Sequence, residues 1–174
     1  MKKIVVLVLM PMTACLLHAQ AAGDPLSAGA KATFGIAKNN IVKSADKMPE
    51  ENYAFKPTPD VRSYGQILGH IADAQYGFCS AVLGETNPAP GIEKSKTGKA
   101  DLVKALNDAF AYCDKAYNGM TDAHAADMVK FFGREQAKLS VLAFNTAHDF
   151  EHYGNLVTYL RLKGLVPPSS EQRR

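Results

Sequence analysis

The sequence predicts an all-α protein whose single domain is a four-helix bundle. Four segments of the 174-residue chain repeat apolar residues at three- and four-residue steps, which is the spacing of one face of an α-helix. The segments between them are rich in Pro and Gly, residues that end helices. No segment reads as a run of strands. Four amphipathic helices that each need one apolar face covered are typical of a four-helix bundle.

The first residues predict a secretory signal peptide. Two lysines precede an apolar run over residues 4–17, and residues 19–21 (AQA) form a small-x-small cleavage site. A membrane anchor or a buried first helix is the alternative, but the run is shorter than the roughly 20 residues of a membrane span and contains Pro11. Lipoprotein processing at Cys15 is a third interpretation, which Met12 disfavours. We therefore expect a bacterial periplasmic or secreted protein without stable membrane insertion after cleavage.

Cleavage near Ala21 leaves residues 22–174, a length typical of one domain and sufficient to bury a core. The formal charge falls from +3 to +1, because two lysines are the only charged side chains that the signal peptide removes. This balance leaves no electrostatic footprint for nucleic acid, so we expect no nucleic-acid partner.

Two cysteines remain in the mature chain, Cys79 and Cys113. They are too few and too far apart for a zinc site of paired cysteines. In a compartment that tolerates disulfides they either form one bridge or pack as small apolar residues.

The first two predicted helices have clear boundaries. Pro49 supplies the stop of the first helix, and residues 50–60 form an extended linker. Ser63 and Gln66 can form a capping box at the start of the second helix, which Gly84 closes. The residues expected to face the core are Ala30, Phe34, Ala37, Ile41, Ala45 and Met48 in the first helix and Ile67, Ile71, Ala74, Phe78 and Val82 in the second.

A loop over residues 85–99, rich in Pro, Gly and Lys, is long enough to cross one end of the bundle before the third helix. Residues 119–127 separate that helix from the fourth, which we expect over roughly residues 135–163 with Gly164 as its C-terminal cap. The third helix buries Leu102, Leu106, Ala109, Phe110, Cys113 and Tyr117. The fourth presents two adjacent stripes, one of Leu139, Ala143, Thr146, Phe150, Tyr153, Val157 and Leu160, and one of Val141, Asn145, His148, His152, Leu156 and Tyr159.

The run HDFEH at residues 148–152 fits the inverted zinc-protease signature H-x-x-E-H. Within a helix, His148 and His152 lie one turn apart on the same face, where two imidazoles can chelate one metal ion. The alternative is a solvated or hydrogen-bonded pair of histidines. Apolar and aromatic residues share their row, which indicates a half-buried position and favours the metal.

His70 is the candidate third ligand. It lies in the middle of the second helix beside Ile67 and Ile71 on the covered face, where a lone histidine is more often a hydrogen-bonded core residue. Together with a facing H-x-x-x-H it completes a three-histidine set, which for zinc or nickel leaves positions for water or substrate. A peptidase is not expected, because too little chain follows the fourth helix to supply a downstream carboxylate ligand, and no strand is expected beside the metal to hold a peptide.

The runs SADKMPEENYAFKPTPDVRSYGQILGHIADAQYGFCSAVLGE and FNTAHDFEHYGNLVTYLRLKGLVPPS closely resemble the DinB-like superfamily of bacterial metalloproteins. The resemblance implies an up-down-down-up bundle with a long crossover between helices 2 and 3. It also implies a divalent metal, commonly zinc or nickel, held by His70, His148 and His152. Parallel second and third helices would place Cys79 and Cys113 at similar heights, which is compatible with a disulfide.

The function expected from the residues and the resemblance is that of a metal-dependent hydrolase or a transferase of thiols or other small nucleophiles, acting on an unknown small molecule. Characterised relatives include thiol-dependent S-transferases and isomerases. The alternative is a non-enzymatic metal-binding or stress-related bundle. The apolar-rich first helix offers a surface for a homodimer.

Further candidate residues lie close to the expected metal ligands. Glu151 and Asp73 could each reach a ligand's second ring nitrogen or a bound water, although each could equally be an ordinary solvated or helix-pairing acid. Asn145 and Tyr76 are candidates for the pocket wall. His124 is expected to be a surface histidine in the loop before the fourth helix.

Overall fold

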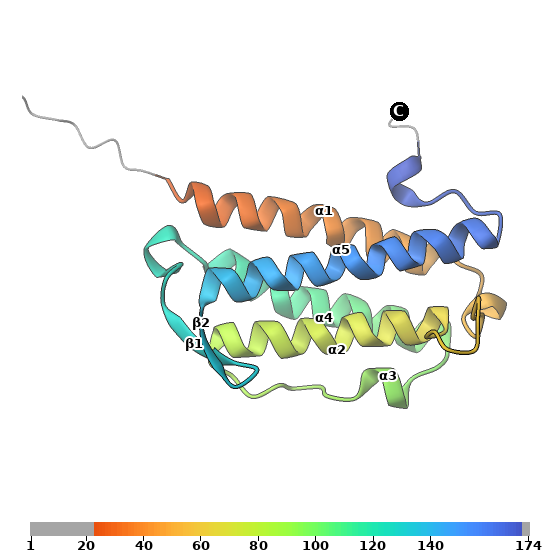
Figure 1. Ribbon diagram of the computed structural model, residues 1–174, viewed down its shortest axis with the longest axis horizontal. Coiled ribbons are helices and arrows are strands. Elements are labelled where there is room, and N and C mark those ends of the chain that lie inside the picture. The colour runs from red at the N-terminus through yellow and green to blue at the C-terminus, as the bar shows by residue number, and fades with distance from the viewer. Residues whose placement is uncertain (1–22, 172–174) are drawn as a thin grey trace, which may run out of the picture.

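The computed structural model describes residues 23–171, and its architecture is a bundle of four long helices (Figure 1). These helices are α1 (Pro25–Lys47), α2 (Tyr64–Leu83), α4 (Lys99–Gly119) and α5 (Lys138–Leu162). In Figure 1, α1 and α5 run in one direction and α2 and α4 in the other, which is the up-down-down-up order. The predicted all-α bundle is confirmed, while the predicted signal peptide, residues 1–21, lies outside the described residues.

Short elements connect the long helices. The crossover between α2 and α4 contains α3 (Ile92–Ser95), and a hairpin of β1 (Met128–Phe131) and β2 (Arg134–Ala137) precedes α5. Three 3-10 turns, η1 (Glu50–Asn52), η2 (Asp122–His124) and η3 (Pro168–Ser170), complete the element order. Within residues 23–171, no helix combines the length and the hydropathy needed to cross a membrane.

The predicted boundaries of α2 are confirmed. Ser63 Oγ accepts a hydrogen bond from the Gln66 backbone N–H, and the Gln66 side chain accepts one from the Ser63 N–H. Each bond satisfies a donor that the first turn of a helix leaves free. Gly84 ends the helix with a φ of 71°, a left-handed conformation that glycine adopts without a steric penalty.

The expected core faces of α1, α2 and α4 are largely confirmed. In α1, Phe34 is buried and stacks on Tyr117 of α4 with ring centroids 3.9 Å apart. All six expected core residues of α4 are buried, while Ala30 and Ala74 among those of α1 and α2 are half-buried. The bundle core therefore lies where the helical periodicity of these three helices places it.

The buried face of α5 differs from the prediction. Two residues of the first expected stripe, Ala143 and Phe150, are exposed, and most of the second stripe is buried. Asp149, which belongs to neither stripe, is fully buried. The face of α5 that packs on α1 and α2 contains most of the second stripe and only those residues of the first stripe that lie nearest to it.

The β hairpin corrects two expectations, the absence of strands and a fourth helix beginning near residue 135. Residues 134–137 pair with residues 128–131, and α5 begins only at Lys138. The turn consists of Phe132 and Gly133, which both have positive φ values, 47° and 75°. A strand of four residues is too short for an alternation of apolar and polar residues to be recognised in the sequence. Phe131, the buried residue of β1, packs on Phe78 of α2 with ring centroids 4.8 Å apart.

A disulfide between Cys79 and Cys113 joins α2 to α4, so of the two alternatives open for these cysteines the structure has the bridge. The two Cα atoms are 5.2 Å apart, within the usual range for a disulfide. The parallel course of α2 and α4 brings the two residues to the same height, although 34 positions separate them in the sequence.

Reducing this disulfide should lower the free energy of unfolding by about 3–4 kcal/mol, because the unfolded chain regains the entropy of a loop of 34 positions. Urea denaturation with and without dithiothreitol measures the difference, and an intact-mass gain of two hydrogens verifies reduction. A Cys79→Ala, Cys113→Ala double variant is the control and should not respond to the reductant. A wild-type midpoint that does not move although the mass has shifted would contradict the prediction.

Candidate metal centre

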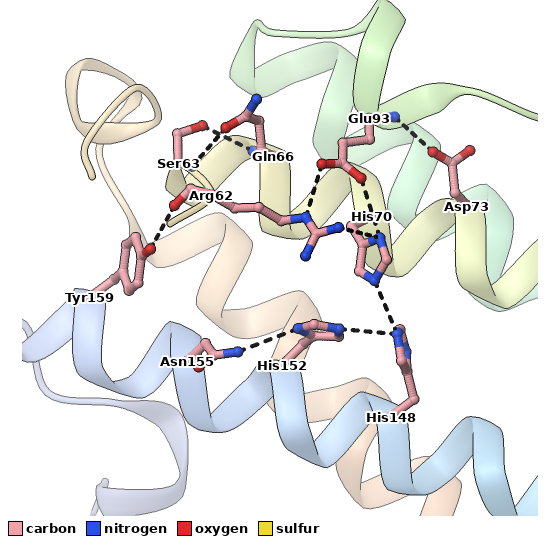
Figure 2. A network of polar contacts seen from close by, with 10 residues as sticks. All are labelled: Arg62, Ser63, Gln66, His70, Asp73, Glu93, His148, His152, Asn155 and Tyr159. Carbon is pink, nitrogen blue, oxygen red and sulfur yellow. Dashed lines mark hydrogen bonds and ion pairs between the residues drawn. The ribbon is translucent and has the colours of Figure 1, made fainter. Parts of the chain in front are cut away.

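Three histidines from two helices meet at one point of the bundle (Figure 2). His70 projects from the middle of α2, and His148 and His152 project from α5. His148 Nε2 lies 3.1 Å from His70 Nε2 and 3.0 Å from His152 Nε2. One ring nitrogen from each histidine lies within 4.8 Å of the others, so the structure brings together all three residues proposed as ligands.

The environment of the His148 and His152 rings keeps these two uncharged at neutral pH. Burial, and secondly the charge of neighbouring histidines, lowers the pKa of His148 and of His152 to about 4. His152 is only 6% exposed. A neutral imidazole is the form that binds a metal, because one ring nitrogen then has a free lone pair.

The spacing of the three rings fits a metal ion. Two nitrogens bound at about 2.0–2.1 Å to one tetrahedral ion lie about 3.3 Å apart. The separations of 3.0 and 3.1 Å are close to that value. A donor set of three imidazoles also has the chemistry that zinc and nickel prefer.

Glu93 and Arg62 support His70 from the side opposite the other two histidines (Figure 2). Glu93 Oε2 lies 3.2 Å from His70 Nδ1, and Arg62 Nε donates to Glu93 Oε1 at 2.9 Å. Arg62 Nη2 is also 3.4 Å from His70 Nδ1. If Nδ1 donates its proton to the Glu93 carboxylate, the lone pair of Nε2 faces the centre, which is the usual arrangement of a metal-bound histidine.

The crossover helix α3 delivers Glu93 to this position. Asp73 of α2 accepts hydrogen bonds from the backbone N–H groups of Ile92 at 2.7 Å and Glu93 at 2.9 Å. At Gly69 a Cβ atom would lie 2.7 Å from Glu93 Cα, so only glycine permits this approach. The sequence does not predict this role of Glu93, because a Pro- and Gly-rich loop gives no sign of which of its residues returns to a distant helix.

The other two histidines have different outer contacts. His152 Nδ1 lies 3.4 Å from the side-chain amide nitrogen of Asn155, and an amide rotated by half a turn would present its oxygen as an acceptor there. His148 Nδ1 is buried and has no hydrogen-bond partner within residues 23–171. Its ring packs instead on Phe78, with centroids 5.7 Å apart.

Two cavities flank the histidines. One of about 700 Å³ has His152 in its wall together with Arg62, Glu93 and Glu151. The other, of about 410 Å³, has His70 and His148 in its wall. Four aromatic residues also line it, namely Phe78, Phe131, Phe132 and Phe144. The candidate metal centre is therefore flanked by a polar cavity on one side and by an aromatic cavity on the other.

Comparison with known proteins identifies the family. Residues 34–156 match the sequence profile of the DinB superfamily. The chain belongs to the DinB superfamily. One curated relative is YjoA, an uncharacterized protein of Bacillus subtilis (strain 168). It is 26% identical over 131 residues, which cover 73% of this chain and 84% of the relative.

Solved structures show the same fold. A DinB-like protein from Bacillus cereus ATCC 10987 superposes with a TM-score of 0.72 at 18% identity, covering 81% of this chain and 95% of that protein. For YjoA from Bacillus subtilis the TM-score is 0.68 at 22% identity, with 84% and 99% covered. A conserved protein from Enterococcus faecalis gives 0.64 at 15% identity, with 78% and 95% covered. The family resemblance seen in the sequence is thus confirmed.

The other residues proposed as candidates from the sequence lie at several different places in the structure. Asp73 caps α3 and so supports Glu93, which takes the place beside His70 for which Asp73 was one candidate. Glu151 is exposed at the wall of the polar cavity. His124 is exposed and pairs with Asp127, as expected for a surface histidine.

Asn145 and Tyr76 were candidates for the pocket wall, but neither lines the two cavities beside the histidines. Tyr76 packs on Tyr112 with ring centroids 5.2 Å apart. Asn145 is fully buried and donates to Gln75 Oε1 at 3.1 Å and to Tyr117 Oη at 3.3 Å. Its amide thus serves the hydrogen bonding of the core and not the cavity surface.

Asp149 is the unexpected acid of this interior network. Its Oδ1 accepts a hydrogen bond of 2.6 Å from Gln75 Nε2, and burial raises the pKa of the carboxyl to about 8. In the described part of the chain, Asp149 Oδ2 and Asn145 Oδ1 are buried without a hydrogen-bond partner. These residues lie one helical turn apart, and a protonated carboxyl can donate where a carboxylate cannot.

Replacing Asp149 with Asn should stabilise the metal-free protein at neutral pH. The unfolded chain releases the Asp proton near its ordinary pKa of about 3.9, whereas the folded chain keeps it to about pH 8. The folded state therefore holds more protons in this window, and the group costs about 1.4 kcal/mol of unfolding free energy for each pH unit of increase. Urea denaturation of both proteins in a chelator, from pH 4 to 8, measures this difference.

The lowered pKa values of His148 and His152 act in the opposite direction, because the unfolded state holds their protons up to about pH 6.5. These contributions are common to the wild type and the Asp149→Asn variant and cancel in the comparison. A stability difference that stays constant from pH 4 to 8 would show that Asp149 is already ionised in the folded protein.

Proposed function

We propose that this chain binds one divalent metal ion, zinc or nickel, through His70, His148 and His152, and acts as an exported metal-dependent enzyme. The observation that carries the proposal is the meeting of three histidine ring nitrogens from α2 and α5 within 4.8 Å of one another. A divalent cation held by these three histidines would supply Lewis acidity, which would polarise an oxygen or sulfur atom of a substrate. The reaction class is hydrolysis or transfer of a thiol or another small nucleophile.

The number of protein ligands favours an enzyme over a structural site. Metal sites that only stabilise a fold usually have four protein ligands, whereas reactive sites have three and leave room for substrate. Within residues 23–171, the group that could hold the ion contains only these three histidines. The two flanking cavities, which have these histidines in their walls, offer space for a small molecule beside them.

The chain's own residues would divide the work around this centre. Glu93 accepts the Nδ1 proton of His70 and orients the ring, while Arg62 holds Glu93. Glu151 is exposed at the polar cavity, where its carboxylate can carry a proton to or from a substrate bound beside His152.

Export to the periplasm, or secretion, is part of the proposal. It rests on the signal-peptide pattern of residues 1–21. The disulfide between Cys79 and Cys113 supports it, because such bridges persist in oxidising compartments and are rare in the cytosol.

Elemental analysis of mature protein purified from the periplasm should find about one equivalent of zinc or nickel per chain. Substituting His70, His148 or His152 with Ala should remove most of it, because two imidazoles bind far more weakly than three. His124→Ala is the matched control and should keep its metal, since this exposed histidine pairs with Asp127 and is not a member of the three-histidine group. Full metal content in the three ligand variants would refute the site.

The same preparations separate the enzyme from a non-enzymatic metal-binding bundle. A screen of ester, amide and thiol-transfer substrates should reveal a turnover that disappears with a chelator and with His152→Ala. A fourth protein ligand in an anomalous-scattering map, together with no metal-dependent turnover, would favour the non-enzymatic alternative.

Glu93→Gln should weaken metal binding by about 10- to 100-fold, the usual effect of removing a partner of a metal-bound histidine. The amide keeps the shape of the carboxylate but loses the charge that accepts the His70 Nδ1 proton. Competition with a chromophoric zinc chelator measures the dissociation constant.

Gly69→Ala tests the same contact without altering either partner, since a Cβ there would displace the Glu93 backbone. It should also weaken metal binding by about tenfold or more. Gly77→Ala, on the same helix with no atom within 4 Å of the added Cβ, should leave the affinity unchanged. If Glu93→Gln binds zinc as tightly as the wild type, Glu93 does not position the ligand.

A further inference from the structure

Phe132 is an unusual residue for its place in the chain. It occupies the first position of the two-residue β1–β2 turn with a φ of 47°. Such turns favour Asn, Asp or Gly at this position, because a larger side chain is strained at positive φ. Burial does not offset the strain, since Phe132 is 76% exposed. Neither the conformation of the turn nor burial in the core therefore explains why residue 132 is aromatic.

The ring stands at the rim of the aromatic cavity. Its centroid lies 4.1 Å from that of Phe131 and 6.3 Å from that of Phe78. Phe144 of α5, which is 49% exposed, lies on the same cavity with its ring 5.3 Å from Phe78. Two exposed aromatic rings from different elements thus converge on one hollow.

The hollow has the dimensions and the position of a small-molecule site. Its volume of about 410 Å³ lies in the range of cavities that hold small ligands. His70 and His148, two of the three candidate ligands, form part of its wall. The cavity on the side of His152 contains Arg62, Glu93 and Glu151 but none of the four phenylalanines, so these aromatic rings lie on one side of the three histidines only.

We infer that the aromatic cavity binds an apolar group, about the size of a phenyl ring, of a substrate whose polar head reaches the three histidines. This inference rests on the proposed function, and it names the class of substrate: a small amphipathic molecule with an oxygen or sulfur head and an aromatic or branched apolar tail. A concave wall that includes two histidines fits such a molecule better than it fits the flat surface of a second copy of the chain.

The test compares phenylacetohydroxamate with acetohydroxamate, which share a metal-binding head and differ in the ring. Binding to the cobalt-loaded protein is followed by the visible spectrum of the metal. Wild type should bind the phenyl compound at least about tenfold more tightly, the effect expected from burying part of one ring. The Phe132→Ala, Phe144→Ala double variant should bind both with similar affinity. Phe150→Ala, an exposed aromatic of α5 outside the cavity, should keep the wild-type preference.

A second measurement keeps this inference separate from the proposed function. Saturation-transfer NMR on the metal-free protein should detect contact with the phenyl protons in the wild type and lose it in the double variant. If cobalt does not bind, the proposed function fails, and the NMR measurement on the metal-free protein alone decides the inference.

Three results would overturn the inference. One is equal affinity of the cobalt-loaded wild type for the two hydroxamates, and another is no saturation transfer to the phenyl protons in the metal-free wild type. The third is a wild-type dimer that sedimentation shows dissociating in the double variant, which would assign the rings to contact between copies.

Discussion

The alignment of α2 with α5 is the constraint on which the rest of the structure depends. Three imidazoles can share one point only if His70 lies level with the gap between the two histidines of α5. Hydrogen bonds on both sides fix this register. Gln75 donates to Asp149 at 2.6 Å toward one end, and Tyr159 Oη donates to the Arg62 carbonyl at 2.6 Å toward the other. A slide of one helix along the other would break both contacts, so the geometry of the histidines is held by the bundle itself.

The topology of the bundle explains how Glu93 comes to lie beside His70. Parallel α2 and α4 require a connection that runs the whole length of the bundle, as Figure 1 shows. Part of that connection folds as α3, which Asp73 caps and Gly69 allows to approach closely. Glu93 then reaches His70 without any distortion of α2. A bundle with short loops throughout would have no segment available for this contact.

The sequence predicts what depends on local spacing and misses what depends on distant partners. Helical periodicity and the capping box of Ser63 and Gln66 are set within a few residues, and the structure has them as expected. The H-x-x-x-H pair is equally local, and His70 could be added because its neighbours are apolar. Glu93 could not be predicted, since its role arises from the return of the crossover. Asp149 breaks the apolar pattern of α5, and its burial is tolerable only because Gln75 from α2 meets it.

The helices and the connections between them supply different parts of the candidate site. The helices supply the three nitrogens and hold them rigidly, but much of the surface that a ligand would meet comes from elsewhere. The linker before α2 contributes Arg62 to the polar cavity, and the β hairpin contributes Phe131 and Phe132 to the aromatic one. Connections tolerate changes in length and composition that a packed helix does not. The same bundle and the same three histidines could therefore serve different ligands. In this chain the β hairpin, which the helical periodicity did not predict, favours a ligand with an apolar group.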